Sequence, residues 1–338
     1  MKKAQFILVV LLIVSMLLLA ACGGGSAPAQ GAGQGNPITI RLAHVVAEDS
    51  HFGYAAERFR ELVEERTNGE ITVEIFPAGQ LGQEREVLEN LQSDAIEMTI
   101  TGHDPLAMFV PMIAALSMPY VFDDEYHAFR VVDSDFGVQI QEEALAQNLR
   151  ILAFGANGFR VTTTSDAPIH TPEDMQGVRI RTPQAPVNLA IMEALGAVPI
   201  ALPFGETYSA LQQGVVEGQE NALPQIYDSR FAEVQSYLSL TNHLYGFTTL
   251  IIGEPAFERL TSEQQEIVIQ AGYEAMMAQR TFSMNLSNNV LVDALEAEGL
   301  TVIRPDLALF REATRDVHLQ FIDEFGGLEI YEWLLSIR

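Results

Sequence analysis

The segment from Gly177 to Asn221 constrains the fold more than any other part of the chain. Short apolar runs and helical stripes alternate along it, a pattern that predicts strand, helix, strand, helix, strand. Its first strand carries Arg179 and Arg181, which we expect to face in opposite directions, one toward the core or solvent and the other toward a cleft. Parallel α/β units bind ligands at the carboxyl ends of their strands, which is where Arg181, Phe204 and Asn221 fall.

The N-terminal third of the fold shows the same alternation. Residues 38–44, 71–75 and 96–100 alternate apolar and polar side chains as strands do, and helical spacing separates them. Such a run predicts a right-handed parallel sheet. We expect one helix over 125–147, followed by a strand over 149–154.

The next stretches suggest how two halves are connected. Residues 155–160, Gly-Ala-Asn-Gly-Phe-Arg, are read as a hinge, with a plain turn as the alternative, and the chain is expected to cross back around 241–252. From Thr261 to Gly299 there is no proline and one internal glycine, Gly272. One helix of up to ~38 residues, ~57 Å long, is expected, or two helices broken near Gly272 or at Asn288-Asn289.

Four motifs in the central segment carry a family resemblance. They are Gly177-Val-Arg-Ile-Arg181, Leu195-Gly-Ala-Val-Pro199, Leu211-Gln-Gln-Gly214 and Val216-Glu-Gly-Gln-Glu-Asn221. Together they resemble the DctP-type solute-binding proteins of TRAP transporters. The resemblance implies an α/β, two-lobed periplasmic binding protein-like fold with a long helix spanning both lobes. It implies capture of an organic acid by lobe closure and delivery to TRAP membrane permease subunits.

The same resemblance implies a binding site. Arg181 matches the arginine that clamps a ligand carboxylate, a task that suits the two parallel donors of a guanidinium. Arg160 matches a second arginine near the ligand, Asn221 an amide that completes carboxylate recognition, and Phe204 a ring against the ligand. The alternatives are an ion pair between lobes for Arg160 and a surface arginine for Arg181.

Two histidines at predicted strand ends are further candidates for ligand contact. His44 follows the first strand and His103 the third, and a purely structural role is the alternative for each. Sialic-acid-binding members of the family carry Asn and Glu where this chain has Val45 and Gly102, which disfavours sialic acid.

The N-terminus predicts export and a lipid anchor. Lys2 and Lys3 precede an apolar run that ends at Ala21, and the only cysteine, Cys22, follows. We expect a signal peptide over 1–21 and a lipidated Cys22 with a flexible tether over 22–37, which places the protein in the periplasm or on the outer face of the cytoplasmic membrane. An uncleaved anchor is the alternative.

Charge excludes some functions. The formal net charge is −26, which argues against nucleic acid, whose phosphates demand basic patches. The seven histidines are scattered, and neither His-Glu-x-x-His nor Gly-x-Ser-x-Gly occurs. No enzyme activity, metal or cofactor is therefore expected. A binding protein for an ATP-driven importer or sensor kinase and a secreted hydrolase are the alternatives.

We expect four segments to form the two lobes. Residues 38–158 and 247–283 are assigned to lobe I, and residues 159–246 and 284–338 to lobe II.

Overall fold

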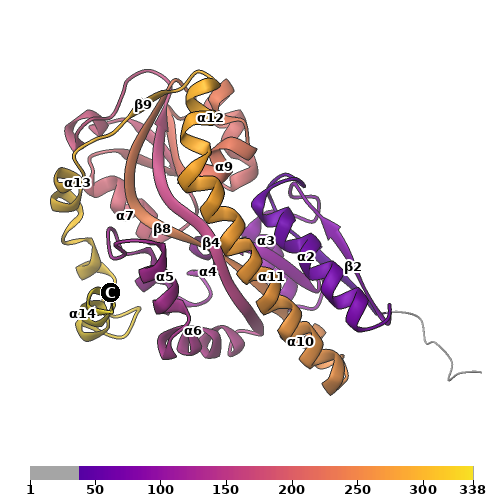
Figure 1. Cartoon of the computed structure of the whole chain (residues 1–338). Helices are drawn as coiled ribbons and strands as arrows, with labels where there is room; N and C mark the ends of the chain where they lie inside the picture. The colour runs from indigo at the N-terminus through magenta and orange to yellow at the C-terminus, as the bar shows by residue number, and fades with distance from the viewer. Residues whose placement is uncertain (1–37, 338) are drawn as a thin grey trace, which may run out of the picture. The chain divides into compact units, whose positions relative to one another are not determined.

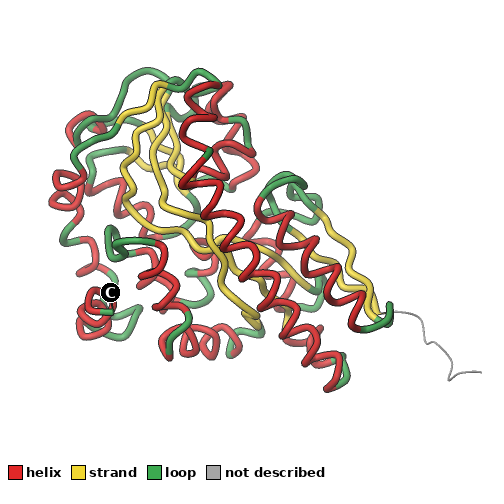
Figure 2. The backbone as a smooth tube through the Cα atoms, viewed as in Figure 1, coloured by secondary structure: helices red, strands yellow, loops and turns green. Residues whose placement is uncertain are grey.

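The computed structural model describes residues 38–337, apart from the side chains of Asn288 and Asn289. The predicted signal peptide, Cys22 and the tether lie outside the described residues. Within residues 38–337, no helix is both long and apolar enough to cross a membrane. Figure 2 shows helices on both sides of a long central sheet.

The sheet begins with the three strands expected from the N-terminal pattern. β1 (Ile38–Ala43) pairs in parallel with β2 (Ile71–Phe76) and with β3 (Met98–Gly102), as predicted. These three strands are called the first half of the sheet. The helix α2 (His51–Arg66) begins where the Ser50 side chain accepts a hydrogen bond from the Gly53 amide.

Two long antiparallel strands form the centre of the sheet. They are β4 (Leu149–Thr164) and β8 (Tyr237–Gly253), in the order β2-β1-β3-β8-β4-β7-β5-β6, with β9 (Thr301–Ile303) beside β8. The C-terminal part of β8 pairs with β3, and the C-terminal part of β4 pairs with β7. The expected strand over 149–154 therefore continues through the glycine-rich stretch that the sequence suggested as a hinge or turn.

The central segment folds as its pattern predicts. β5 (Arg179–Thr182) pairs in parallel with β6 (Val198–Ala201) and with β7 (Gly218–Ala222). These strands are called the second half of the sheet. Helices α7 (Pro186–Ala194) and α8 (Thr207–Gln212) connect them.

The long C-terminal helix is real but shorter than the single helix expected. α11 covers Ser262–Asn289, and α12 covers Leu291–Ala297, so the helix breaks where the Asn288-Asn289 alternative placed the break. Gly272 lies inside α11 without breaking it. A glycine fits this position because any side chain there would collide with Leu152 on β4. α11 packs against α2 and β4 and reaches α9 (Leu223–Asp228) and α12 at its far end (Figure 1).

The helix predicted over 125–147 is in fact two helices. They are α5 (Glu125–Val132) and α6 (Asp135–Leu145). The chain breaks between them because Ser134 caps α6 by accepting a hydrogen bond from the Phe136 amide, and such local bonds compete with a continuous helix.

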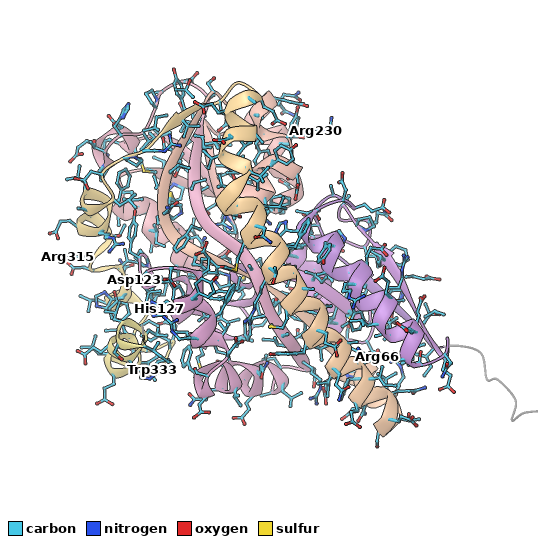
Figure 3. The ribbon with its side chains drawn as sticks, viewed as in Figure 1. Arg66, Asp123, His127, Arg230, Arg315 and Trp333 are labelled. Atoms are coloured by element: carbon cyan, nitrogen blue, oxygen red, sulfur yellow. The ribbon has the colours of Figure 1, made fainter. Side chains whose placement is uncertain are left out.

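The C-terminal helix α14 (Leu328–Ser336) packs against these two helices. The Trp333 ring lies 5.7 Å from that of Phe136, and His127 Nε2 donates to the Leu334 carbonyl at 2.8 Å. Figure 3 labels Trp333 and His127 in this part of the molecule. α14 thus contacts helices that the expected boundaries assign to the other lobe, and those boundaries stay a prediction. The remaining elements are α3 (Glu84–Gln92), α4 (His103–Leu106), α10 (Glu254–Glu258), α13 (Leu307–Thr314) and the 3-10 turns Pro111–Ser117, Pro172–Met175, Phe204–Glu206, Phe231–Glu233 and Val317–Gln320.

Candidate ligand-binding site

The four central site residues predicted from the sequence converge on one small cavity. Arg160 lies on β4, Arg181 on β5, Asn221 on β7, and Phe204 in the turn after β6. The opposite wall comes from the first half of the sheet and its connections. The other lining residues are Glu84, Gly102, Asp104, Pro105, Asn157, Pro183 and Gln225.

Arg181 is a buried cation without a carboxylate partner. Its Nε and Nη2 both donate to the Leu202 carbonyl, at 3.0 and 2.7 Å. Among the described residues, no acidic side chain forms an ion pair with it. Burial, reinforced by Arg160 nearby, lowers the pKa of Arg181 to about 10. A buried charge left unpaired is costly, so this position is suited to an anion supplied from outside.

Arg160 is buried too, but its charge is neutralised within the protein. Its Nε and Nη2 donate to the two carboxylate oxygens of Glu220 at 2.5 and 2.9 Å, and Nη1 donates to Asn221 Oδ1 at 3.1 Å. Nη1 also lies 3.5 Å from Asp104 Oδ2, from the first half of the sheet. Burial opposes its charge, yet Glu220 and Asp104 keep the pKa of Arg160 above its ordinary value. Arg160 therefore joins the cavity lining, and its main ion pair is with Glu220 on the neighbouring strand β7. Its 3.5 Å contact with Asp104 connects segments that the expected boundaries assign to different lobes, so the ion pair between lobes stays a prediction.

Glu220 anchors this network. Besides Arg160, it contacts His243 Nε2 at 3.1 Å and Asn188 Nδ2 at 3.4 Å. Burial alone would raise its pKa, but Arg160 and His243 hold the pKa of Glu220 at about 2. Glu220 was not among the site residues predicted from the sequence, although it lies inside the Gln-Glu-Asn motif next to Asn221.

Arg179 and Arg181 correct the expectation about their strand. They do not face in opposite directions, because side chains two residues apart on a strand point to the same face. They differ in depth: Arg179 is exposed at the start of β5 and pairs with Glu217, whereas Arg181 is covered by the chain at Leu202.

The two histidine candidates, His44 and His103, lie at strand ends as expected, but neither is among the residues that line the cavity. His103 accepts a hydrogen bond from the Phe247 amide at Nδ1 (3.1 Å), so its Nε2 carries the proton and donates to Ser117 Oγ at 2.9 Å. Burial lowers the pKa of His103. Both of its ring nitrogens are thus occupied within the protein.

His44 has a different environment. It is buried against Phe52, and neither ring nitrogen has a hydrogen-bond partner among the described residues. Burial lowers its pKa to about 4, and the neighbouring His51 adds to this shift. His44 is therefore neutral at pH 7. A ligand contact by either histidine stays a prediction.

Sequence reasoning missed the acidic and amide side chains of the cavity. Glu84 Oε1, at the start of α3, accepts from Thr101 Oγ1 and the Gly102 amide, and burial raises the pKa of Glu84. Asn157 on β4 donates to Gln225 Oε1 at 3.0 Å. Asp104 directly follows His103, so its place at a strand end was a usable signal; Glu84, Asn157 and Gln225 could be placed only once the strand order was known.

The cavity lined by Arg160 and Arg181 is called the arginine cavity. Its volume is about 20 Å³, which is room for roughly one water molecule. A second small cavity shares Arg181, Phe204 and Glu84 with it. An organic acid therefore fits only if the two walls separate.

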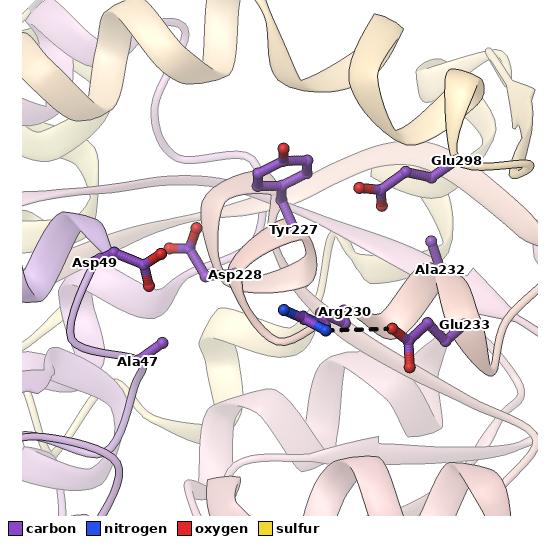
Figure 4. Close-up of a pocket in the computed structure, with 8 residues that line it drawn as sticks. All are labelled: Ala47, Asp49, Tyr227, Asp228, Arg230, Ala232, Glu233 and Glu298. Atoms are coloured by element: carbon purple, nitrogen blue, oxygen red, sulfur yellow. Dashed lines mark ion pairs between the residues drawn. The ribbon is translucent and has the colours of Figure 1, made fainter.

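A larger cavity of about 560 Å³ lies elsewhere, between residues 47–49 and residues 227–233 (Figure 4). Four carboxylates line it, and its one cation, Arg230, already pairs with Glu233 at 3.8 Å. Size alone would favour this cavity, but its charge disfavours an organic acid. Among the described residues, no group of three or more His, Cys, Asp or Glu is placed to hold a metal ion.

Comparisons with known proteins show the family to which the chain belongs. The model of the family "bacterial extracellular solute-binding protein, family 7" (DctP) matches residues 42–324. A solute-binding protein of Roseobacter denitrificans is 34% identical over 88% of this chain and 91% of its own, and the C4-dicarboxylate-binding periplasmic protein DctP of Rhodobacter capsulatus is 32% identical over 86% and 88%. A TRAP periplasmic solute-binding protein of Polaromonas sp. JS666, solved with D-erythronate, superposes with a TM-score of 0.86 at 32% identity, covering 89% of this chain and 99% of that one. The chain belongs to the DctP family of TRAP transporter solute-binding proteins.

Proposed function

We propose that this protein captures an organic acid by its carboxylate, with Arg181 as the principal clamp. The observation that carries the proposal is the buried Arg181 guanidinium, which has a main-chain carbonyl but no carboxylate as partner among the described residues. One similar protein is named a C4-dicarboxylate-binding protein, and another was solved with bound D-erythronate, which supports organic acids as the ligand class. Asn221 and Phe204 line the same cavity and complete the site.

Capture involves separation and closure of the two walls. Contacts between the walls that hold the closed arrangement include the Gly205 amide donating to Gln83 Oε1 at 3.0 Å, His51 Nδ1 at 3.4 Å from Asp228 Oδ2, and Arg160 Nη1 at 3.5 Å from Asp104 Oδ2. The first two are single polar contacts, each worth about 1 kcal/mol, and the third is a long contact of an arginine that Glu220 already pairs, so opening is accessible. Closure on a ligand excludes water and strengthens the charge-assisted bonds from Arg181.

Delivery follows from the family. TRAP solute-binding proteins work outside the cytoplasm and pass their ligand to a membrane permease, and we propose the same partner here. We also propose that Cys22 carries a lipid that keeps the protein near that permease, on the basis of the short apolar run and small residues before it. Replacement of Cys22 by Ser should then move the full-length protein from the membrane fraction to the soluble fraction; an unchanged membrane fraction would refute lipid anchoring.

A thermal-shift screen of the folded domain tests the proposed function. The panel pairs organic acids, among them D-erythronate, D-galactonate and succinate, with neutral analogues such as erythritol and galactitol. A ligand at 100 times its dissociation constant adds about 2.7 kcal/mol to the free energy of unfolding, which the melting temperature reports. Shifts with acids and not with their neutral analogues support the carboxylate clamp. Shifts with neutral polyols alone contradict it.

A further inference from the structure

The charges around Arg181 narrow the ligand class further, given the proposed function. Two cations line the arginine cavity, but Glu220 already holds Arg160 through both carboxylate oxygens. Only Arg181 is left to bind an external anion. The site therefore offers one unneutralised positive charge, enough for one carboxylate.

The wall opposite Arg181 is acidic. Asp104 and Glu84 both line the cavity; Asp104 lies in α4, directly after β3, and Glu84 is the first residue of α3. Asp104 is 3% exposed, and its Oδ1 makes no hydrogen bond among the described residues; His103 Nε2, which donates to Ser117 Oγ, lies 3.6 Å from it. An orphaned buried carboxylate oxygen is costly, so this atom is suited to accept a hydrogen bond from a ligand.

Glu84 offers a second acceptor. Thr101 Oγ1 and the Gly102 amide both donate to its Oε1, and Glu84 lines both small cavities together with Arg181, so its Oε2 is available to a ligand. The Gln225 side chain adds an amide group, whose Oε1 is already bonded to Asn157. The exposed Arg85 also borders the second cavity, but it pairs with Glu89 on its own helix.

From this arrangement we infer that the ligand is a hydroxylated monocarboxylate, held by its carboxylate at Arg181 and by its hydroxyl groups at Asp104 and Glu84. Hydroxyls donate to carboxylates, whereas a second ligand carboxylate would meet two acidic side chains in a buried site. The site should therefore discriminate against C4-dicarboxylates. Because burial raises the pKa of Glu84, this discrimination should weaken as the pH falls and Glu84 becomes protonated.

Isothermal titration calorimetry at pH 7.5 tests the inference with three probes: D-erythronate, butyrate of the same carbon number without hydroxyls, and succinate. We expect D-erythronate to bind the wild-type protein at least 10-fold more tightly than butyrate and at least 100-fold more tightly than succinate. Succinate binding as tightly as D-erythronate would overturn the inference while leaving the carboxylate clamp intact. Failure of all three acids to bind would instead overturn the proposed function, and the inference with it.

Two variants locate the selectivity. Asp104→Asn and Glu84→Gln keep the side-chain size and remove the charge, so each should weaken D-erythronate binding about 10-fold and leave succinate binding equal or tighter. Two variants are used because Asp104 also contacts Arg160, so its replacement could disturb the fold. Glu86→Gln, exposed on α3 and outside both cavity linings, is the matched control: it leaves the Arg85–Glu89 pair intact and should change neither affinity. Equal losses for both ligands in both variants would contradict the roles assigned to Asp104 and Glu84.

Discussion

Gln279 and Ala156 are joined by a reciprocal pair of hydrogen bonds. The Ala156 amide donates to Gln279 Oε1 at 2.8 Å, and Gln279 Nε2 donates to the Ala156 carbonyl at 2.7 Å. The pair ties α11 to β4 where the pairing of β4 with β8 shifts register, between Ala156 and Gly158. The intervening Asn157 uses its side chain to contact His51 on α2 and Gln225 on α9. α11 thus fixes the stretch of β4 that carries Asn157 and, three residues later, Arg160.

Loss of the Gln279 amide should destabilise the protein. Gln279→Leu leaves a buried N–H and a buried carbonyl without partners, and each such group costs about 1–3 kcal/mol. Urea unfolding should therefore show a fall of at least about 2 kcal/mol in the free energy of unfolding. Gln270→Leu, on the exposed side of the same helix, should stay within about 0.5 kcal/mol of wild type. Similar effects of the two substitutions would mean that the Ala156 pair contributes little.

His44 should make stability depend on pH between 6.5 and 4. Burial lowers its folded-state pKa to about 4 from 6.5, so on acidification the unfolded chain takes up a proton before the folded protein does. The free energy of unfolding then falls as the pH drops through this range, by up to about 3 kcal/mol in total. His44→Gln should flatten this part of the stability profile, measured by urea unfolding at several pH values. The exposed His170→Gln is the control, and an equal slope in wild type and His44→Gln would refute the effect.

Protonation of Glu220 should also lower the free energy of unfolding on acidification, but at lower pH than protonation of His44. Its folded-state pKa of about 2 lies below the ordinary 4.5, so its stabilisation is fully present above pH 4.5 and is lost as the pH falls toward 2. Glu220→Gln removes the main partner of buried Arg160 and should cost about 3–5 kcal/mol at pH 7. The gap between variant and wild type should narrow below pH 4.5. A gap that is constant from pH 7 to pH 3 would show that the charge of Glu220 is not what stabilises the network.

Ligand binding should make the protein more compact. The arginine cavity takes about one water molecule as it stands, so the ligand-free protein must sample wider arrangements to admit an acid. Small-angle X-ray scattering with and without a saturating acid from the screen should give a smaller radius of gyration in the bound state. Superimposable profiles would argue against closure.

The parts of the site carried by local patterns could be predicted from the sequence. Arg181 and Asn221 lie in short motifs at the ends of alternating strands, and strand alternation also indicated both sets of parallel strands. The length of β4 could not be predicted, because its glycines read as a turn. Gly155 is required for a different reason: a Cβ there would lie 2.3 Å from Gln279 Oε1 and from Thr248 Oγ1.

The position of Asp104 directly after a strand was a usable signal, but the meeting of the acidic wall with Arg181 could not be predicted. Glu84 and Asp104 meet Arg181 only through the order of strands, in which residues some 80–100 positions apart share one cavity. Short-range periodicity holds no information on that order. The helix break at Ser134 was not predicted either, because neither glycine nor proline stands between the end of α5 and the start of α6.

The most direct test of the central claim is the affinity of Arg181→Lys for the acid that gives the largest thermal shift, measured by isothermal titration calorimetry. Lysine keeps the charge and a donor for the Leu202 carbonyl but loses the paired donors, so binding should weaken ~10-fold or more, about 1.4 kcal/mol, while the melting temperature of the ligand-free protein stays nearly unchanged. Arg179→Lys, on the same strand but exposed, should bind as wild type does. Unchanged affinity in Arg181→Lys would remove Arg181 from the binding site and contradict the account.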